Sequence, residues 1–106
     1  MIRLIAEYSA QAEFDIIDSV DYYSSTAGAR IAGQLSSAVE ACVSRIEAWP
    51  EAGSQRYGEI LGIPGLRHVN ISRFPYAIFY LLDEQRVLII RMLHTARDIP
   101  ATLAEH

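Results

Sequence analysis

The sequence predicts an α+β fold of order β-α-α-β-β-β, with a helical hairpin packed on one face of a mostly antiparallel, curled sheet. The hairpin is predicted by two segments with apolar side chains at helical spacing, joined by a short glycine-containing turn: residues 10–23 and 29–49. The sheet is predicted by three later segments rich in β-branched and aromatic residues: residues 66–72, 76–82 and 86–93. The links between these three are too short for a crossover, so we expect an antiparallel meander. A chain of 106 residues has room for one core, and we expect a single domain over residues 1–106.

The N-terminal segment predicts a strand followed directly by a helix. Residues 2–8 alternate apolar and polar side chains, as a half-buried strand does. Ser9 stands where its side-chain oxygen can cap a helix that begins at Ala10. We expect the apolar side of this helix to consist of Phe14, Ile16, Ile17, Val20 and Tyr23. We expect its exposed, acidic side to carry Asp15, Asp18 and Asp21.

The second helix shows the clearest pattern in the chain, and Pro50 ends it. Its apolar stripe is Ile31, Leu35, Ala38, Val39, Cys42, Ile46 and Trp49. On this pattern Cys42 is a small core residue, and Trp49 belongs to the core rather than to a binding platform. Residues 50–58 predict a polar loop, and residues 63–65 predict a turn.

The last two strand segments are apolar on both sides, which predicts cover on both faces of the sheet. The helical hairpin covers one face. Residues 94–100 are expected to form a loop and residues 101–105 a last turn of helix, which leaves little chain for the other face. We therefore expect the sheet to curl over its own residues and another chain to supply part of the cover, because a large bare apolar patch is unusual on a soluble monomer.

Composition excludes several classes of protein. An apolar content of 51% excludes a disordered tail, and no uncharged apolar segment is long enough to cross a bilayer. Without a secretory signal and with one cysteine, the chain is expected to be cytoplasmic, without membrane contact or internal disulfide. Nine arginines, no lysine and thirteen acids give a net charge of −4, which argues against a general nucleic-acid coat. We also expect no direct sequence-specific DNA binding by this chain alone.

The candidate binding residues are arginines, tyrosines and one histidine from the sheet and its connections: Arg67, Arg73, Tyr76, Tyr80, Arg91, His94 and Arg97. Arginine suits carboxylate and phosphate recognition and is a poor general acid or base. We expect several of these arginines to converge on one rim of the sheet. The alternative for each is a surface ion pair, such as Arg97 with Asp98 or Arg86 with Glu84.

The remaining chemistry is sparse. His94 has the pKa range of a general acid or base. With no serine, cysteine or carboxylate placed beside it by a motif, a structural role at the end of the sheet is favoured. No His or Cys pair has metal-ligand spacing, so we expect no metal and no cofactor.

Taken in order, several short motifs resemble toxins of the RelE/ParE superfamily of type II toxin–antitoxin systems, on the ParE or plasmid-stabilisation side. The matching pieces are Ala12-Glu-Phe-Asp15-Ile-Ile, Tyr22-Tyr23, Ile46-x-x-Trp-Pro50, Gly65-Leu-Arg67, Arg73-Phe-Pro-Tyr-Ala-Ile-Phe-Tyr80, Val87-Leu-Ile-Ile90 and His94-x-x-Arg97-Asp98. The resemblance implies the β-α-α-β-β-β fold, a cytoplasmic bacterial protein and a cognate antitoxin, ParD-like with a ribbon-helix-helix domain, that neutralises it.

Two mechanisms occur in that superfamily, and the resemblance favours the ParE type. RelE-like members cut messenger RNA on the ribosome with lysines, arginine and a late tyrosine, whereas this chain has no lysine, carries Ala77 after Tyr76 and has no tyrosine after Tyr80. ParE-like members bind and inhibit DNA gyrase without catalysis, which implies a target- or antitoxin-binding role for the seven candidate residues. Two alternatives stay open: a ribosome-dependent nuclease with a reduced site on Arg73, His94 and Arg97, and a non-toxic remnant.

Overall fold

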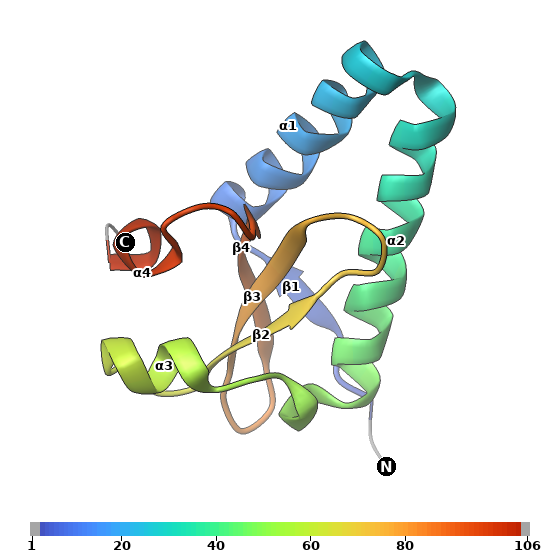
Figure 1. Cartoon of the computed structure of the whole chain (residues 1–106). Coiled ribbons are helices and arrows are strands. Elements are labelled where there is room, and N and C mark those ends of the chain that lie inside the picture. Colours follow the sequence, from blue (N-terminus) through green and yellow to red (C-terminus); the bar gives the residue numbers. More distant parts are fainter. Residues whose placement is uncertain (1–2, 105–106) are drawn as a thin grey trace.

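The computed structural model describes residues 3–104, in which a helical hairpin and two short helices surround a four-stranded sheet (Figure 1). The elements in chain order are β1 (Ala6–Tyr8), α1 (Ala10–Ala27), α2 (Ala29–Ala48), a 3-10 turn η1 (Pro50–Ala52), α3 (Arg56–Leu61), β2 (Leu66–Asn70), β3 (Tyr76–Leu82), β4 (Val87–His94) and α4 (Ile99–Ala104). The predicted α+β class and the order of the main elements are confirmed. The predicted polar loop is wrong in part, because η1 and the start of α3 lie within it. Ile2 and Glu105, included in the predicted first strand and last helical turn, lie outside the described residues.

The sheet is mixed, with strand order β1-β4-β3-β2. The pairs β2–β3 and β3–β4 are antiparallel, as the short links predicted, while β1 pairs with β4 in parallel. The β3–β4 link turns on Asp83, whose Oδ1 accepts hydrogen bonds from the backbone N–H groups of Gln85 and Arg86. Just before β2, Gly65 has φ +80° and approaches the backbone of β3 closely. A Cβ at this position would lie 2.5 Å from the Leu82 carbonyl oxygen, so only glycine fits.

The hairpin covers one face of the sheet as predicted. Ser9 caps α1 by accepting a hydrogen bond from the Ala12 N–H at 3.0 Å, and Gly28, at φ 95°, separates α1 from α2. The core under the hairpin joins the α2 stripe to β3 and β4 and includes Leu35, Val39, Cys42, Ile46, Ile78, Tyr80, Val87 and Ile89. Burial raises the pKa of the Cys42 thiol to about 11, so Cys42 is an uncharged core residue at neutral pH.

The second face of the sheet is covered by α3 and α4, which lie on the side of the sheet away from α2 (Figure 1). Leu66, Ala77, Phe79 and Leu93 form a second core with Ile99 and Leu103 of α4, and Tyr57 and Leu61 of α3 pack against it. The expectation that another chain covers this face is therefore wrong. Two six-residue helices are too short to show periodicity, yet together they bury the apolar side chains that predicted a missing cover.

Two burial predictions are also wrong. On α1 the buried residues are Ala12, Asp15 and Ser19, so Asp15 faces the protein interior, while Phe14 and Ile17 are 60% and 59% exposed. At the end of α2, Trp49 is 59% exposed, because it lies one residue past the last helical turn and no longer follows the stripe. None of the helices within residues 3–104 combines the length and apolarity that a membrane crossing requires.

Candidate functional site

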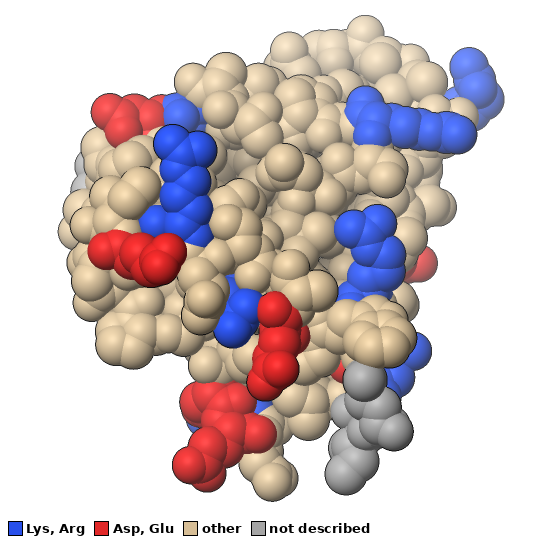
Figure 2. Space-filling model, turned by 60° about the horizontal axis from the view of Figure 1, so that its bottom comes forward, with Lys and Arg blue, Asp and Glu red and all other residues tan. Residues whose placement is uncertain are grey.

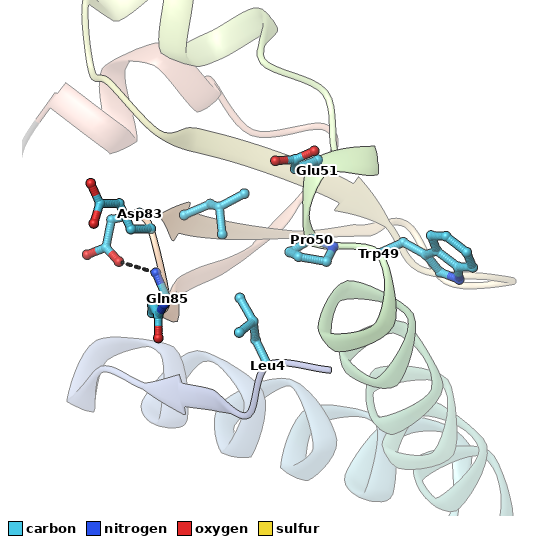
Figure 3. A pocket seen from close by; sticks show the side chains of 8 residues that line it. Leu4, Trp49, Pro50, Glu51, Asp83 and Gln85 are labelled. Carbon is cyan, nitrogen blue, oxygen red and sulfur yellow. Dashed lines mark hydrogen bonds between the residues drawn. The ribbon is translucent and has the colours of Figure 1, made fainter. Parts of the chain in front are cut away.

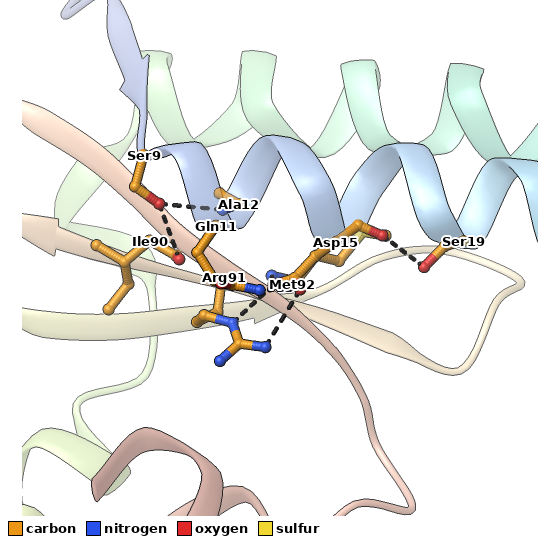
Figure 4. A network of polar contacts seen from close by, with 8 residues as sticks. All are labelled: Ser9, Gln11, Ala12, Asp15, Ser19, Ile90, Arg91 and Met92. Carbon is orange, nitrogen blue, oxygen red and sulfur yellow. Dashed lines mark hydrogen bonds and ion pairs between the residues drawn. The ribbon is translucent and has the colours of Figure 1, made fainter. Parts of the chain in front are cut away.

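A β-bulge in β4 determines the geometry of the candidate site. Tyr80 pairs with Ile89 and Phe79 pairs with Arg91, so Ile90 is an extra residue in β4. Arg91 and Asp15 of α1 point toward each other (Figure 4). Arg91 Nε donates to Asp15 Oδ2 at 2.7 Å and Arg91 Nη2 donates to Asp15 Oδ1 at 3.2 Å, and both side chains are buried. This is a two-point, charge-assisted pair between the hairpin and the sheet.

The start of α1 also satisfies the backbone groups that the bulge frees from the strand ladder. The Ser9 hydroxyl donates to the Ile90 carbonyl at 3.0 Å, and the Met92 N–H donates to Asp15 Oδ2 at 3.0 Å (Figure 4). The Ser9 N–H donates to the Ile89 carbonyl at 2.9 Å. The buried polar groups of this junction therefore hold α1 at one position on β4.

A polar pocket of about 330 Å³ opens beside the Asp15–Arg91 pair, and four of the seven predicted residues line it: Tyr76, Arg91, His94 and Arg97. Gln11, Phe14 and Asp18 of α1 form its other wall. His94 Nδ1 accepts a hydrogen bond from the Ala96 N–H at 3.0 Å, and its ring meets the Tyr76 ring edge-on, 5.3 Å between centroids. A neutral His94 therefore carries its proton on Nε2.

Arg67 and Tyr80 lie elsewhere and hold the chain that follows α2. Arg67 Nη1 donates to the carbonyl oxygens of Glu51 and Gly53 at 2.6 and 3.0 Å. The Tyr80 hydroxyl donates to the Pro50 carbonyl at 2.7 Å, and the Tyr80 side chain is fully buried. The two residues are register partners in β2 and β3, so they form one structural unit apart from the polar pocket.

Arg73 lies apart from both the polar pocket and the Arg67–Tyr80 unit. It lies in the β2–β3 turn with φ 71°, and it shares a cleft of about 400 Å³ with Arg30 of α2. Sequence reasoning missed Arg30. A usable signal was present, since the first turn of α2 contains an arginine and no acid.

The two ion pairs suggested by sequence proximity are replaced by other contacts. Arg86 pairs with Glu7 of β1 at 3.2 Å rather than with Glu84. Asp98 Oδ1 accepts the Ala101 N–H at 3.2 Å and so caps the start of α4. On the face drawn in Figure 2, arginine and acidic side chains are interspersed over a largely uncharged surface. The predicted single rim of arginines is therefore not formed.

A hollow of about 610 Å³ lies between the N-terminal segment, η1 and the β3–β4 turn. Leu4 and Pro50 face it, whereas Trp49 points away from it (Figure 3). Its rim is acidic, with Glu51, Asp83 and Glu84. Among residues 3–104, no three His, Cys, Asp or Glu side chains come together in a way that could hold a metal ion.

One comparison with known proteins shows the family of this chain, and a second shows its fold. The profile described as "ParE toxin of type II toxin-antitoxin system, parDE" matches residues 6–99. A chain of the solved structure titled "Chromosomal ParDE TA system from P. aeruginosa" has a similar fold, with a TM-score of 0.71 and 18% identity over 87% of this chain and 96% of that one. At this identity the structural similarity concerns the fold. Among curated proteins, none matches the chain significantly.

Proposed function

The chain belongs to the ParE toxin family of type II toxin–antitoxin systems, and on this premise we propose that it inhibits DNA gyrase by binding and is neutralised by a cognate ParD-like antitoxin. The observation that supports binding rather than catalysis is that the Asp15 carboxylate is already engaged within the protein. This carboxylate lines the polar pocket, but it is held by Arg91 and by the Met92 N–H. Two of the predicted residues that line the pocket, Tyr76 and Arg97, are suited to gripping a partner, and arginine does not serve as a proton acceptor.

The antitoxin surface that we propose is the exposed apolar side of α1. Phe14, Ile17 and Tyr22 are each about 60% exposed. Ile17 also lines a groove of about 440 Å³ between α1 and α2, together with Tyr8, Ile16, Val39, Glu13 and Glu40. Exposed apolar residues beside a groove are typical of a site for an amphipathic segment, and permanently held partners bury the more apolar interfaces. This surface takes the role that the second face of the sheet was expected to have.

The test uses purified chain, purified gyrase and relaxed plasmid. We expect the chain to inhibit supercoiling in proportion to its concentration, and the cognate antitoxin to restore it. Programmed ribosomes in a parallel reaction are expected to keep their messenger RNA intact. Supercoiling that continues at saturating chain contradicts the gyrase proposal.

A second candidate is the RelE-type ribonuclease, which is favoured by one observation: Tyr76, His94 and Arg97 line the same pocket. Against it, the lining of that pocket does not include Arg73, which instead borders the cleft with Arg30. If this candidate is correct, His94→Gln abolishes messenger RNA cleavage on the ribosome. If the chain is a non-toxic remnant, its expression leaves both supercoiling and translation unchanged.

A further inference from the structure

An open cleft lies between the first turns of α2 and the β2–β3 turn, which bends toward α2 in Figure 1. Its walls carry Arg30, Gln34 and Ser37 from α2 and Ser72, Arg73 and Phe74 from the turn. Phe74 fixes the turn by packing edge-on against Tyr23 of α1, 5.4 Å between ring centroids. The cleft therefore has two fixed walls, each with one exposed guanidinium group.

The cleft is electropositive on a chain whose net charge is −4. No acidic side chain lines it, and the ion pairs formed within residues 3–104 do not involve Arg30 or Arg73. The first turn of α2 contains no acid, and its N-cap is Gly28, which makes no side-chain cap. The positive end of the helix dipole therefore adds to the two arginines without a local counter-charge.

Arg73 has an unfavourable backbone conformation for its residue type. Its φ of 71° lies in the left-handed region, which costs a side chain with a Cβ about 1 kcal/mol and costs glycine little. Residues held in such conformations concentrate at functional sites. Glycine would adopt this turn conformation at a lower cost. A role for the guanidinium group explains why an arginine is found here despite the strain.

We propose that the Arg30–Arg73 cleft is a second docking site, separate from the apolar side of α1, that binds an Asp- or Glu-bearing segment of the protein this toxin attacks. The proposal rests on the proposed function only in assuming a protein target. Two guanidinium groups with the hydroxyl and amide groups of Ser37, Ser72 and Gln34 match carboxylates. A nucleic acid would bring a row of phosphates against an acidic protein whose arginines are dispersed.

The test compares Arg73→Gly and Arg30→Gln with Arg45→Gln, an exposed arginine of α2 outside the cleft. Arg73→Gly removes the guanidinium and relieves the backbone strain at once, so its thermal stability is expected to stay the same or rise. We expect growth arrest on induction to weaken about tenfold or more for each cleft variant, as loss of a charge-assisted pair implies. The affinity for the antitoxin is expected to stay unchanged, and Arg45→Gln is expected to behave as the wild type.

Three results would overturn the proposal: full growth arrest by Arg73→Gly and Arg30→Gln, loss of antitoxin affinity in step with loss of arrest, or an equal defect in Arg45→Gln. A direct arm titrates isotope-labelled chain with a glutamate-rich decapeptide and, separately, with a DNA duplex. We expect the Nε–H signals of Arg30 and Arg73 to shift with the peptide and not with the duplex. Growth arrest without gyrase inhibition would contradict the gyrase proposal alone. If the wild type causes no arrest, the peptide arm decides, and unshifted signals reject the cleft as a carboxylate site.

Discussion

Asp15 of α1 and Arg91 of β4 form a buried two-point ion pair although 76 positions separate them in the sequence. Such a pair is stable because each charge has its partner, and removal of one leaves the other buried and uncompensated. Here the carboxylate also accepts the Met92 N–H beside the bulge. The Asp15 carboxylate therefore satisfies a charge and a backbone group of β4 at the junction between hairpin and sheet.

We predict that Asp15→Ala lowers the free energy of unfolding by about 3–5 kcal/mol, because Arg91 loses its two-point carboxylate partner and the Met92 N–H loses its hydrogen bond to Asp15. Chemical denaturation measures this change. The matched control is Asp18→Ala, one helical turn away and exposed, which should change stability by less than about 0.5 kcal/mol. Equal effects of the two substitutions would contradict the structural role of the pair.

The close contact between Gly53 and Tyr80 predicts a non-additive pair of substitutions. A Cβ at Gly53 would overlap the Tyr80 hydroxyl oxygen and lie 2.9 Å from Cζ, so Gly53→Ala should destabilise the fold. Tyr80→Phe should cost about 1 kcal/mol through the lost hydrogen bond to the Pro50 carbonyl. In the double variant the hydroxyl is absent, and we expect it to be more stable than the sum of the single effects predicts. Strict additivity in denaturation experiments would argue against the contact.

The cover supplied by α4 is tested with Leu103→Ala. Leu103 is buried in the second core, so its truncation should cost about 2–5 kcal/mol. The exposed apolar surface should also bind a hydrophobic dye. As a control, Gln85→Ala in the exposed β3–β4 turn should have neither effect. An unchanged denaturation midpoint for Leu103→Ala would mean that α4 does not cover the sheet in solution.

His68 predicts a specific dependence of stability on pH. Burial, and secondarily the nearby charge of Arg56, lower the pKa of His68 below its usual 6.5, and its ring stacks on Phe79 with centroids 5.2 Å apart. The unfolded chain then binds the proton more readily than the folded chain, so stability falls as the pH drops from 6.5 toward the lowered pKa. His68→Gln should remove this part of the pH dependence. If the wild type and His68→Gln gave parallel curves of unfolding free energy against pH, this prediction would be contradicted.

The proposed antitoxin surface predicts that Phe14→Ser and Ile17→Ser weaken antitoxin binding by at least about tenfold, since apolar side chains buried in an interface contribute more than about 1.4 kcal/mol each. Both residues are about 60% exposed, so stability should change little. Ile60→Ser on α3 is the control, because Ile60 is 57% exposed and lies far from α1 in the chain. Calorimetric titration measures the affinities. Equal losses for Ile60→Ser and Ile17→Ser would refute the assignment.

The sequence predicted the parts of this structure that depend on short-range patterns. The stripe from Leu35 to Ile46 identified α2 and its buried side, and Ser9 identified the start of α1. The apolar character of β3 and β4 correctly indicated that both faces of the sheet are covered. The sequence indicated a last helical turn at residues 101–105 but not that it covers the second face, and it did not indicate α3, which is six residues long and contains Gly58.

The contacts of the candidate site depend on long-range pairing, for which the sequence has no local signal. Asp15 lies in a row with Asp18 and Asp21 that looks like an exposed acidic face, and its partner Arg91 belongs to the last strand. Arg67 and Arg73 look alike in an acid-free segment, yet one holds η1 through backbone carbonyls and the other borders the cleft with Arg30. Strand pairing and the position of α2 decide between these roles.

The extra residue at Ile90 also determines where β4 tolerates a change of length. Val87 and Ile89 precede it and Met92 follows it, and all three belong to the core under the hairpin, while Leu93 belongs to the core on the other face. Loss of Ile90 would restore a regular ladder and leave these side chains on their present sides. Loss of a residue elsewhere in the strand would exchange apolar side chains between the two cores. Relatives with one residue fewer in this strand are therefore expected to lack the bulge rather than to carry an inverted strand.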